Sequence, residues 1–155
     1  MSELSSLSEL STFHGTFEMT EFKDKLKTEL KPAKTKHFSF GSKLGNILHT
    51  RLRLGRSYLK GHSFSIGMAD SPECDCHAPD ENISHYLLDC FLYTIERWNL
   101  FNLVTQLLPN FHQYSRQKKV DIILSGISGT PENYQINKSL SRITQNFILK
   151  TNRFI

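Results

Sequence analysis

The sequence has few cysteines and their number is odd: three in 155 residues, all of them between positions 74 and 90. A secreted domain held by disulfides normally carries an even number, so a disulfide framework is excluded. No apolar run approaches the roughly 20 residues that cross a bilayer, and Glu3 and Glu9 stand where a signal peptide would be apolar. We therefore expect an intracellular protein, in the reducing environment of the nucleus or cytoplasm.

Acidic residues are absent from positions 31–68, which carry eight basic ones, whereas positions 69–100 carry seven acidic residues and one basic residue. The first segment is suited to phosphates and the second to a cation, although a cluster of this size is about equally often a plain solvated surface. Arginine donates two parallel bonds to phosphate, which favours RNA or DNA as the partner. The candidate nucleic-acid-binding residues are Lys43, Arg51, Arg53, Arg56 and Lys60.

The cysteines form the pattern Cys-x-Cys-x8-His-x4-Cys together with one histidine. Three thiolates and an imidazole are the ligand set of a tetrahedral zinc site, so Cys74, Cys76, His85 and Cys90 are candidate ligands of one structural Zn²⁺. Two alternatives stay open: His77 competes as a ligand, or the three thiols are simply buried. An ideal helix would place His85 and Cys90 about 140° apart, so His85 is expected at a helix start or in the preceding turn.

Hydrophobic periodicity predicts a mainly α-helical protein: a small helical domain over residues 20–155, stapled by the zinc loop, with a flexible segment over residues 1–19. Helices are expected over residues 20–30, 41–55, 57–60, 87–108, around 120–124 and from 130 onward. Gly55 is expected to end the second of these, Ser57 to cap the third and Gly61 to end it.

The strongest amphipathic pattern consists of Leu87, Phe91, Ile95 and Trp98, spaced by four, four and three residues, and it continues through Phe101, Val104 and Leu108. This spacing predicts a helix face that packs in the core, with Trp98 buried. Tyr58 and Phe64 are also expected in the core more often than on a base-stacking surface.

A larger set of residues carries a family resemblance: positions 50–62, Phe64, Ile66, the cysteine and histidine pattern with Tyr86-Leu87-Leu88 inside it, Arg97, Val120–Leu124, Glu132-Asn133 and Thr151–Phe154. Over roughly residues 22–154 this chain resembles the C-terminal segment of reverse transcriptases from non-LTR retrotransposons. The resemblance implies a zinc-knuckle-like Cys-Cys-His-Cys motif that follows the polymerase and helps to hold nucleic acid during target-primed reverse transcription. The family often has glycine after the second cysteine, where this chain has His77.

Catalytic motifs are lacking. The sequence contains no Tyr-x-Asp-Asp or Ala-Asp-Asp run for two magnesium ions, no carboxylate set suited to an RNase H or endonuclease site, and no glycine-rich phosphate loop. We therefore expect a non-catalytic, zinc-dependent nucleic-acid-binding fragment of a retrotransposon reverse transcriptase, with no membrane and no small-molecule substrate. The alternatives are an interaction module that docks on the polymerase domain of its parent element, or a non-functional mobile-element remnant. A thiol redox protein is disfavoured, because Glu73 and Asp75 would raise the thiol pKa.

Overall fold

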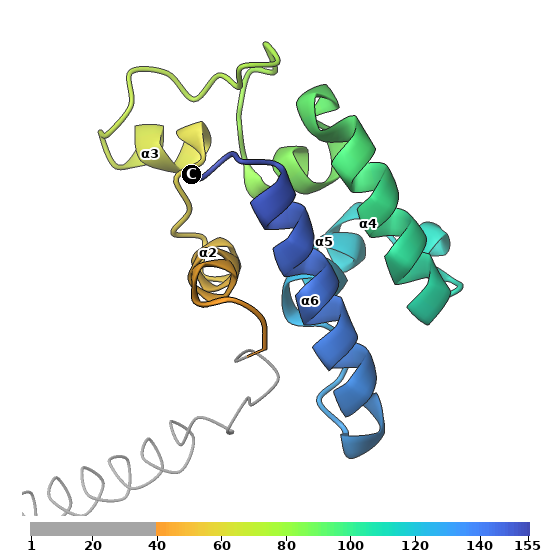
Figure 1. Ribbon diagram of the computed structural model, residues 1–155. Coiled ribbons are helices and arrows are strands. Elements are labelled where there is room, and N and C mark those ends of the chain that lie inside the picture. The colour runs from red at the N-terminus through yellow and green to blue at the C-terminus, as the bar shows by residue number, and fades with distance from the viewer. Residues whose placement is uncertain (1–39) are drawn as a thin grey trace, which may run out of the picture. The chain divides into compact units, whose positions relative to one another are not determined.

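Helices joined by short turns make up residues 40–155, the part of the chain that the computed structural model describes (Figure 1). Within these residues there is no β-strand, which confirms the prediction of a mainly α-helical fold. The described residues all belong to one unit, Lys36–Ile155. The predicted helix over 20–30 and the predicted boundary after residue 19 lie outside the described residues.

Five α-helices and four shorter helical turns are described. They are α2 (Lys43–Arg53), α3 (Lys60–Ser65), a π-helical turn (His85–Asp89), a 3₁₀ turn (Phe91–Tyr93), α4 (Thr94–Leu107), a 3₁₀ turn (Phe111–Gln113), α5 (Arg116–Ser125), a 3₁₀ turn (Pro131–Asn133) and α6 (Tyr134–Lys150).

Capping residues set the ends of α2 and α5. The Ser42 hydroxyl accepts a hydrogen bond from the Gly45 N–H at 2.9 Å, and Gly55 follows the end of α2 with a φ of 67°, as expected for a glycine stop. Ser115 caps α5 through the Lys118 N–H at 3.3 Å, and Gly126 follows its end with a φ of 80°. The predicted helices in these two regions are confirmed.

Helix α6 is central, because it contacts α2, α4 and α5 (Figure 1). The helix expected from residue 130 onward is confirmed, and an apolar stripe of it faces the core: Leu140 and Phe147 are buried, and Ile136 and Ile143 are partly buried against the same core. The π-helical turn also contributes to this core through Tyr86, which is fully buried. The Tyr86 ring lies 5.3 Å from the ring of Phe147, so the segment that carries His85 packs directly on α6.

The prediction for α3 is wrong in its position. The helix begins at Lys60, where the prediction ended it, and it runs through Gly61. Ser57 is buried but caps no helix. The first N–H groups of α3 are instead satisfied by Glu81: its carboxylate accepts from the Lys60 N–H at 2.7 Å and its carbonyl accepts from the Gly61 N–H at 3.2 Å. A helix can therefore start here without a local capping side chain.

Helix α4 presents a different face to the core from the one predicted. Phe91, Ile95 and Trp98 are 64%, 74% and 66% exposed, so the prediction of burial is wrong for these three residues, whereas Leu87 and Val104 of the same stripe are fully buried. The π-helical and 3₁₀ turns before Thr94 change the number of residues per turn, and an extrapolation from Leu87 at the α-helical period loses the correct phase. The buried residues of α4 are Arg97, Leu100 and Val104.

Candidate metal centre

A tight turn brings the first two cysteines of the pattern close together. The Cys74 N–H donates to the Ala78 carbonyl at 2.9 Å, and the His77 N–H donates to the Cys74 carbonyl at 2.8 Å. The turn closes because His77 takes a φ of 68°, in the left-handed region that favours glycine. Both thiols of the turn, Cys74 and Cys76, thereby reach the same space.

The π-helical turn supplies the other two groups. Its defining bond joins the Cys90 N–H to the carbonyl of His85 at 2.8 Å, five residues earlier. An α-helix would rotate the side chains of His85 and Cys90 far apart, whereas the wider π turn brings positions i and i+5 closer to the same side. The prediction that His85 precedes the regular helix agrees with this geometry, since α4 begins only at Thr94.

The four predicted ligand residues come together in the structure. The ligand atoms of Cys74, Cys76, His85 and Cys90 all lie within 4.8 Å of one another. The Sγ atoms of Cys74 and Cys90 are 3.7 Å apart and form no disulfide, and Cys76 Sγ lies 3.2 Å from His85 Nε2. Cys74 and Cys90 are buried, whereas Cys76 and His85 are partly accessible. Such a group of soft donors can hold one metal ion in four-coordinate geometry.

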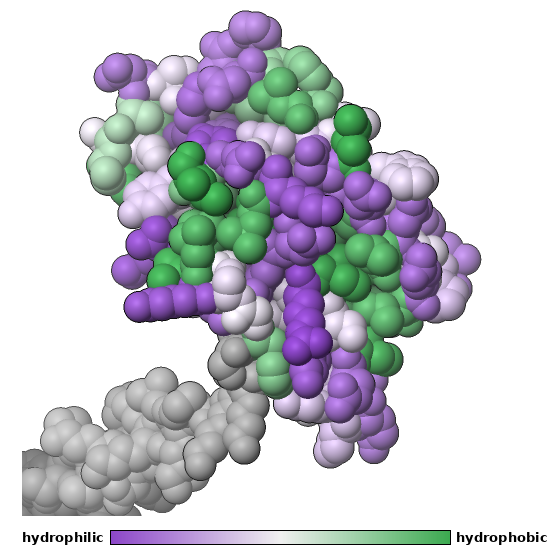
Figure 2. Space-filling model, in the orientation of Figure 1, coloured by the Kyte–Doolittle hydropathy of each residue, from purple (hydrophilic) through white to green (hydrophobic). Residues whose placement is uncertain are grey.

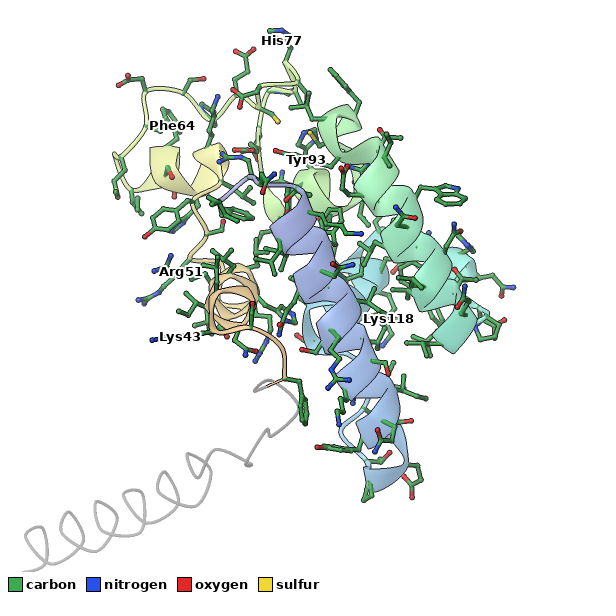
Figure 3. The ribbon with its side chains drawn as sticks, in the orientation of Figure 1. Lys43, Arg51, Phe64, His77, Tyr93 and Lys118 are labelled. Atoms are coloured by element: carbon green, nitrogen blue, oxygen red, sulfur yellow. The ribbon has the colours of Figure 1, made fainter. Side chains whose placement is uncertain are left out.

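His77 is not part of this group. Its side chain is 88% exposed, and its Nδ1 lies 3.2 Å from the Glu73 carboxylate. Figure 3 shows His77 at the outer end of the loop, pointing away from the helices. The sequence left open that His77 competes as a ligand. In the structure His77 lies outside the ligand group.

The protonation of the cluster depends on burial. Burial, followed by the neighbouring thiols, raises the pKa of Cys74 to about 12, so this thiol keeps its proton at neutral pH when no metal is bound. A metal ion must displace that proton to bind the thiolate. The cluster is therefore unsuited to a reactive low-pKa thiol at Cys74. At Cys76 burial acts to raise the pKa, but hydrogen bonds with the Ala78 backbone and with the neighbouring thiols lower it overall, so the expectation that Glu73 and Asp75 raise the thiol pKa is wrong for Cys76.

Arg97 supports the segment that carries His85 and Cys90, a role that the sequence did not predict. Its side chain is buried, and it donates hydrogen bonds to the Leu87 carbonyl at 3.0 Å and to the Cys90 carbonyl. The Leu87 carbonyl belongs to the π-helical turn, and the Cys90 carbonyl, just after it, also accepts from the Tyr93 N–H at 3.2 Å. The sequence signal was the presence of one basic residue, seven positions after Cys90, within an acidic segment.

The predicted phosphate-binding residues have different surroundings. Lys43 and Arg56 are exposed, Arg53 is half-buried, and Arg51 lies over the ring of Tyr58 at 4.9 Å. Lys43 and Arg51 extend from the side of α2 that faces away from α6 (Figure 3). Lys60 differs, because its ammonium contacts the Asp75 carboxylate at 2.5 Å.

The two aromatic residues near this surface were expected in the core, and that prediction is wrong. Tyr58 is 52% exposed and Phe64 is 48% exposed. Tyr58 precedes α3, in the linker from α2, and Phe64 lies in the last turn of that helix. Both side chains are therefore accessible, and Tyr58 lies against the guanidinium of Arg51.

No protein-family model, curated protein or solved structure matches this chain. Among the described residues no helix is both long and apolar enough to cross a membrane. Hydrophilic side chains run along the accessible side of α6, between apolar patches toward α2 and toward α4 (Figure 2).

Proposed function

We propose that residues 40–155 form a zinc-stapled helical module that binds RNA or DNA and has no catalytic role. The observation that carries the zinc part is the separation of the thiols. Tetrahedral zinc with bonds of about 2.3 Å to sulfur keeps two thiolates about 3.8 Å apart. The Sγ atoms of Cys74 and Cys90 are 3.7 Å apart, so they need little rearrangement to bind the ion.

Charge balance also supports this assignment. Three thiolates around one Zn²⁺ carry a net charge of −1, which is costly to bury without a nearby cation. Arg97 is buried against the Cys90 carbonyl and supplies a positive charge on the core side of the cluster. Lys60 lies on the accessible side, paired with Asp75.

Zinc binding is coupled to folding in this proposal. Zinc contributes about 10 to 16 kcal/mol in small finger peptides, whereas a whole domain is stable by only about 5 to 15 kcal/mol. The residues between the ligands include Tyr86 and Leu87, which are fully buried in the core. Release of the ion would therefore free core residues as well as the loop.

The nucleic-acid part is supported by Lys43, Arg51 and Arg56. They lie within the described part of a segment that has no acidic residue, and they extend from α2 and from the turn after it. Three phosphate contacts to a single strand predict a slope of log affinity against log salt near −2, from about 0.7 per contact. Under this proposal the module belongs to the non-catalytic end of a retrotransposon reverse transcriptase, as the sequence resemblance implies.

The test is a salt titration of the zinc-loaded chain with a fluorescent 12-nucleotide single strand, followed by anisotropy. Arg51→Glu and Arg56→Glu should each weaken binding and reduce the slope by about one or more. Lys118→Glu is the matched control, because Lys118 is exposed on α5, away from Arg51 (Figure 3). A slope near zero, or an equal effect of all three reversals, contradicts the proposal.

A second candidate function is protein docking, and the exposed face of Phe91, Ile95 and Trp98 favours it. An apolar face of this kind is unusual on a monomer and often marks an interaction site. This function predicts that the isolated chain self-associates, and that Arg51→Glu barely alters nucleic-acid binding. Light scattering of the chain and of Trp98→Ser separates the two functions, since only docking predicts that Trp98→Ser restores a monomer.

A further inference from the structure

A groove of about 360 Å³ lies beside the basic surface, between the linker from α2 to α3 and the segment that precedes the π-helical turn. Its lining residues include Gly55, Ser57, Leu59, His62, Ile83 and Ser84. The volume is at the small end of the range for ligand sites, about 300 to 1,000 Å³, and suits one flat group rather than an extended ligand. Arg56 stands between two of the lining residues, so the groove opens next to a candidate phosphate contact.

Two side chains of the groove have unused hydrogen-bonding capacity. The Ser57 hydroxyl has no hydrogen-bond partner among residues 40–155; within these residues only Gln145 Oε1 is both buried and unpaired, so the Ser57 oxygen is open to the solvent of the groove. The imidazole of His62 likewise has no partner within the described part of the chain. Both groups are therefore free to form hydrogen bonds with a ligand that enters the groove in place of solvent. A hydroxyl and a neutral imidazole can each donate and accept a hydrogen bond.

The groove does not repel an anionic ligand, although Glu81 contributes to its wall. The Glu81 carboxylate is paired with Arg153 at 2.5 Å and also accepts the Lys60 N–H at 2.7 Å. Its charge and its hydrogen-bonding positions are therefore already in use. Ile83, which is only partly buried, adds an apolar wall of the kind that contacts the face of an aromatic ring.

We propose that this groove binds one unpaired nucleobase of a single strand, whose neighbouring phosphates contact Arg51 and Arg56. The inference rests on the proposed nucleic-acid-binding function and adds the substrate class. Ser57 and His62 would meet the polar edge of the base, and Tyr58, exposed at the rim, would stack on a neighbouring base. A duplex cannot fill the groove without unpairing and unstacking a base, which costs free energy that a single strand does not spend.

The experiment measures affinities of the full zinc-loaded chain for three probes: a 12-nucleotide single strand, the blunt duplex of the same sequence, and a single strand of equal length with abasic sites. The single strand should bind about tenfold more tightly than either of the others, because only it offers an unpaired base. The abasic strand has the same phosphates, so it isolates the contribution of the bases without any change in the protein.

Variants assign the effect to the groove. Ser57→Ala and His62→Ala should each weaken single-strand binding about threefold to tenfold, leave duplex binding unchanged and leave the salt slope unchanged. His62→Gln should recover part of the loss, because its amide also donates and accepts. Ser125→Ala is the matched control, since Ser125 is exposed at the end of α5. Thermal unfolding verifies that each variant is folded.

The outcomes separate the inference from the function on which it rests. Equal affinity for the intact and the abasic strand overturns the groove assignment but leaves phosphate binding in place. Loss of single-strand and duplex binding by the same factor in the Ser57 and His62 variants also overturns it. Failure of all three probes to bind at low salt overturns the proposed function itself.

Discussion

Glu81 and Arg153 form a bidentate ion pair that joins the loop between Cys76 and His85 to the segment after α6. Arg153 Nε lies 2.6 Å from Glu81 Oε1, and a terminal nitrogen of the same guanidinium lies 2.5 Å from Oε2. The Glu81 side chain is 1% exposed and that of Arg153 is 17% exposed. The Glu81 carboxylate also accepts a hydrogen bond from the Lys60 N–H. This one side chain therefore connects the loop between Cys76 and His85 with α3 and with the segment after α6.

Glu81→Gln should lower the free energy of unfolding by about 3 kcal/mol, because it leaves a largely buried guanidinium without its counter-charge. Chemical unfolding of the zinc-loaded protein measures the loss. The double variant Glu81→Gln/Arg153→Met should lose less than the sum of the two single changes, since the pair acts as a unit. Glu132→Gln, at an exposed carboxylate, is the control and should change stability by less than 1 kcal/mol. Additive losses would contradict a coupled pair.

The helices were predictable where a local signal determines them. Ser42, Gly55 and Gly126 act within a few residues of the helix ends that they set, and the stripe of α6 follows a regular period. The clustering of the four candidate ligands was also predictable, because their residue types and short spacing express the chemistry directly.

The rest depends on contacts that a local pattern does not contain. Arg153 pairs with the carboxylate of Glu81, 72 residues earlier in the chain, and Lys60 pairs with Asp75. The prediction of the buried face of α4 failed because a π-helical turn and a 3₁₀ turn precede the helix. The spacing of Phe91, Ile95 and Trp98 does not reveal these turns. The role of Arg97 was equally hidden from the sequence, because it depends on the positions that the π-helical turn gives to the Leu87 and Cys90 carbonyls.

One zinc ion per chain is expected by native mass spectrometry, with loss of bound zinc in Cys90→Ser. A strong chelator should remove the ion and abolish cooperative thermal unfolding, because core residues lie between the ligands. His77→Ala should retain one zinc, as its side chain is exposed and outside the cluster. Loss of zinc in His77→Ala, or retention in Cys90→Ser, would show that the ion is held by a different set.

His77→Gly should stabilise the zinc-loaded protein by about 1 kcal/mol. The φ of 68° is costly for a side-chain-bearing residue, by about 1 to 2 kcal/mol, and part of that gain is offset by the greater entropy of glycine in the unfolded chain. The contact with Glu73 is exposed and contributes little. His77→Ala is the matched control, because alanine keeps the backbone penalty. Equal stability of the glycine and alanine variants would contradict the backbone explanation.

Arg97→Met should weaken zinc binding about tenfold to a hundredfold without removing any ligand. The guanidinium orients the Leu87 and Cys90 carbonyls, and groups that orient metal ligands typically have effects of that size. Competition with a chromophoric chelator measures the affinity, and Arg97→Lys should recover part of it. Trp98→Ala, next to it but exposed, should leave zinc affinity unchanged. An unchanged affinity in Arg97→Met would reduce Arg97 to a packing residue.

Stability should fall as the pH falls from about 6.5 to about 4 because of His49. Burial lowers the pKa of His49 from 6.5 to about 4, although its hydrogen bond with the Leu124 carbonyl at 2.8 Å acts in the opposite direction. Between these values the unfolded chain binds a proton that the folded chain does not, so protonation favours unfolding by up to about 3 kcal/mol.

The comparison is between the native chain and His49→Gln, whose amide can still donate to the Leu124 carbonyl but cannot become charged. Acid release of the metal affects both proteins alike, since both keep all four ligands. The difference in unfolding free energy between the two proteins, measured at intervals from pH 8 to pH 4, isolates the histidine. It should be constant above about pH 7 and shift in favour of His49→Gln below that value. A constant difference across the whole range would show that His49 accepts its proton without unfolding, and therefore that the α2 and α5 contact around it is open to water.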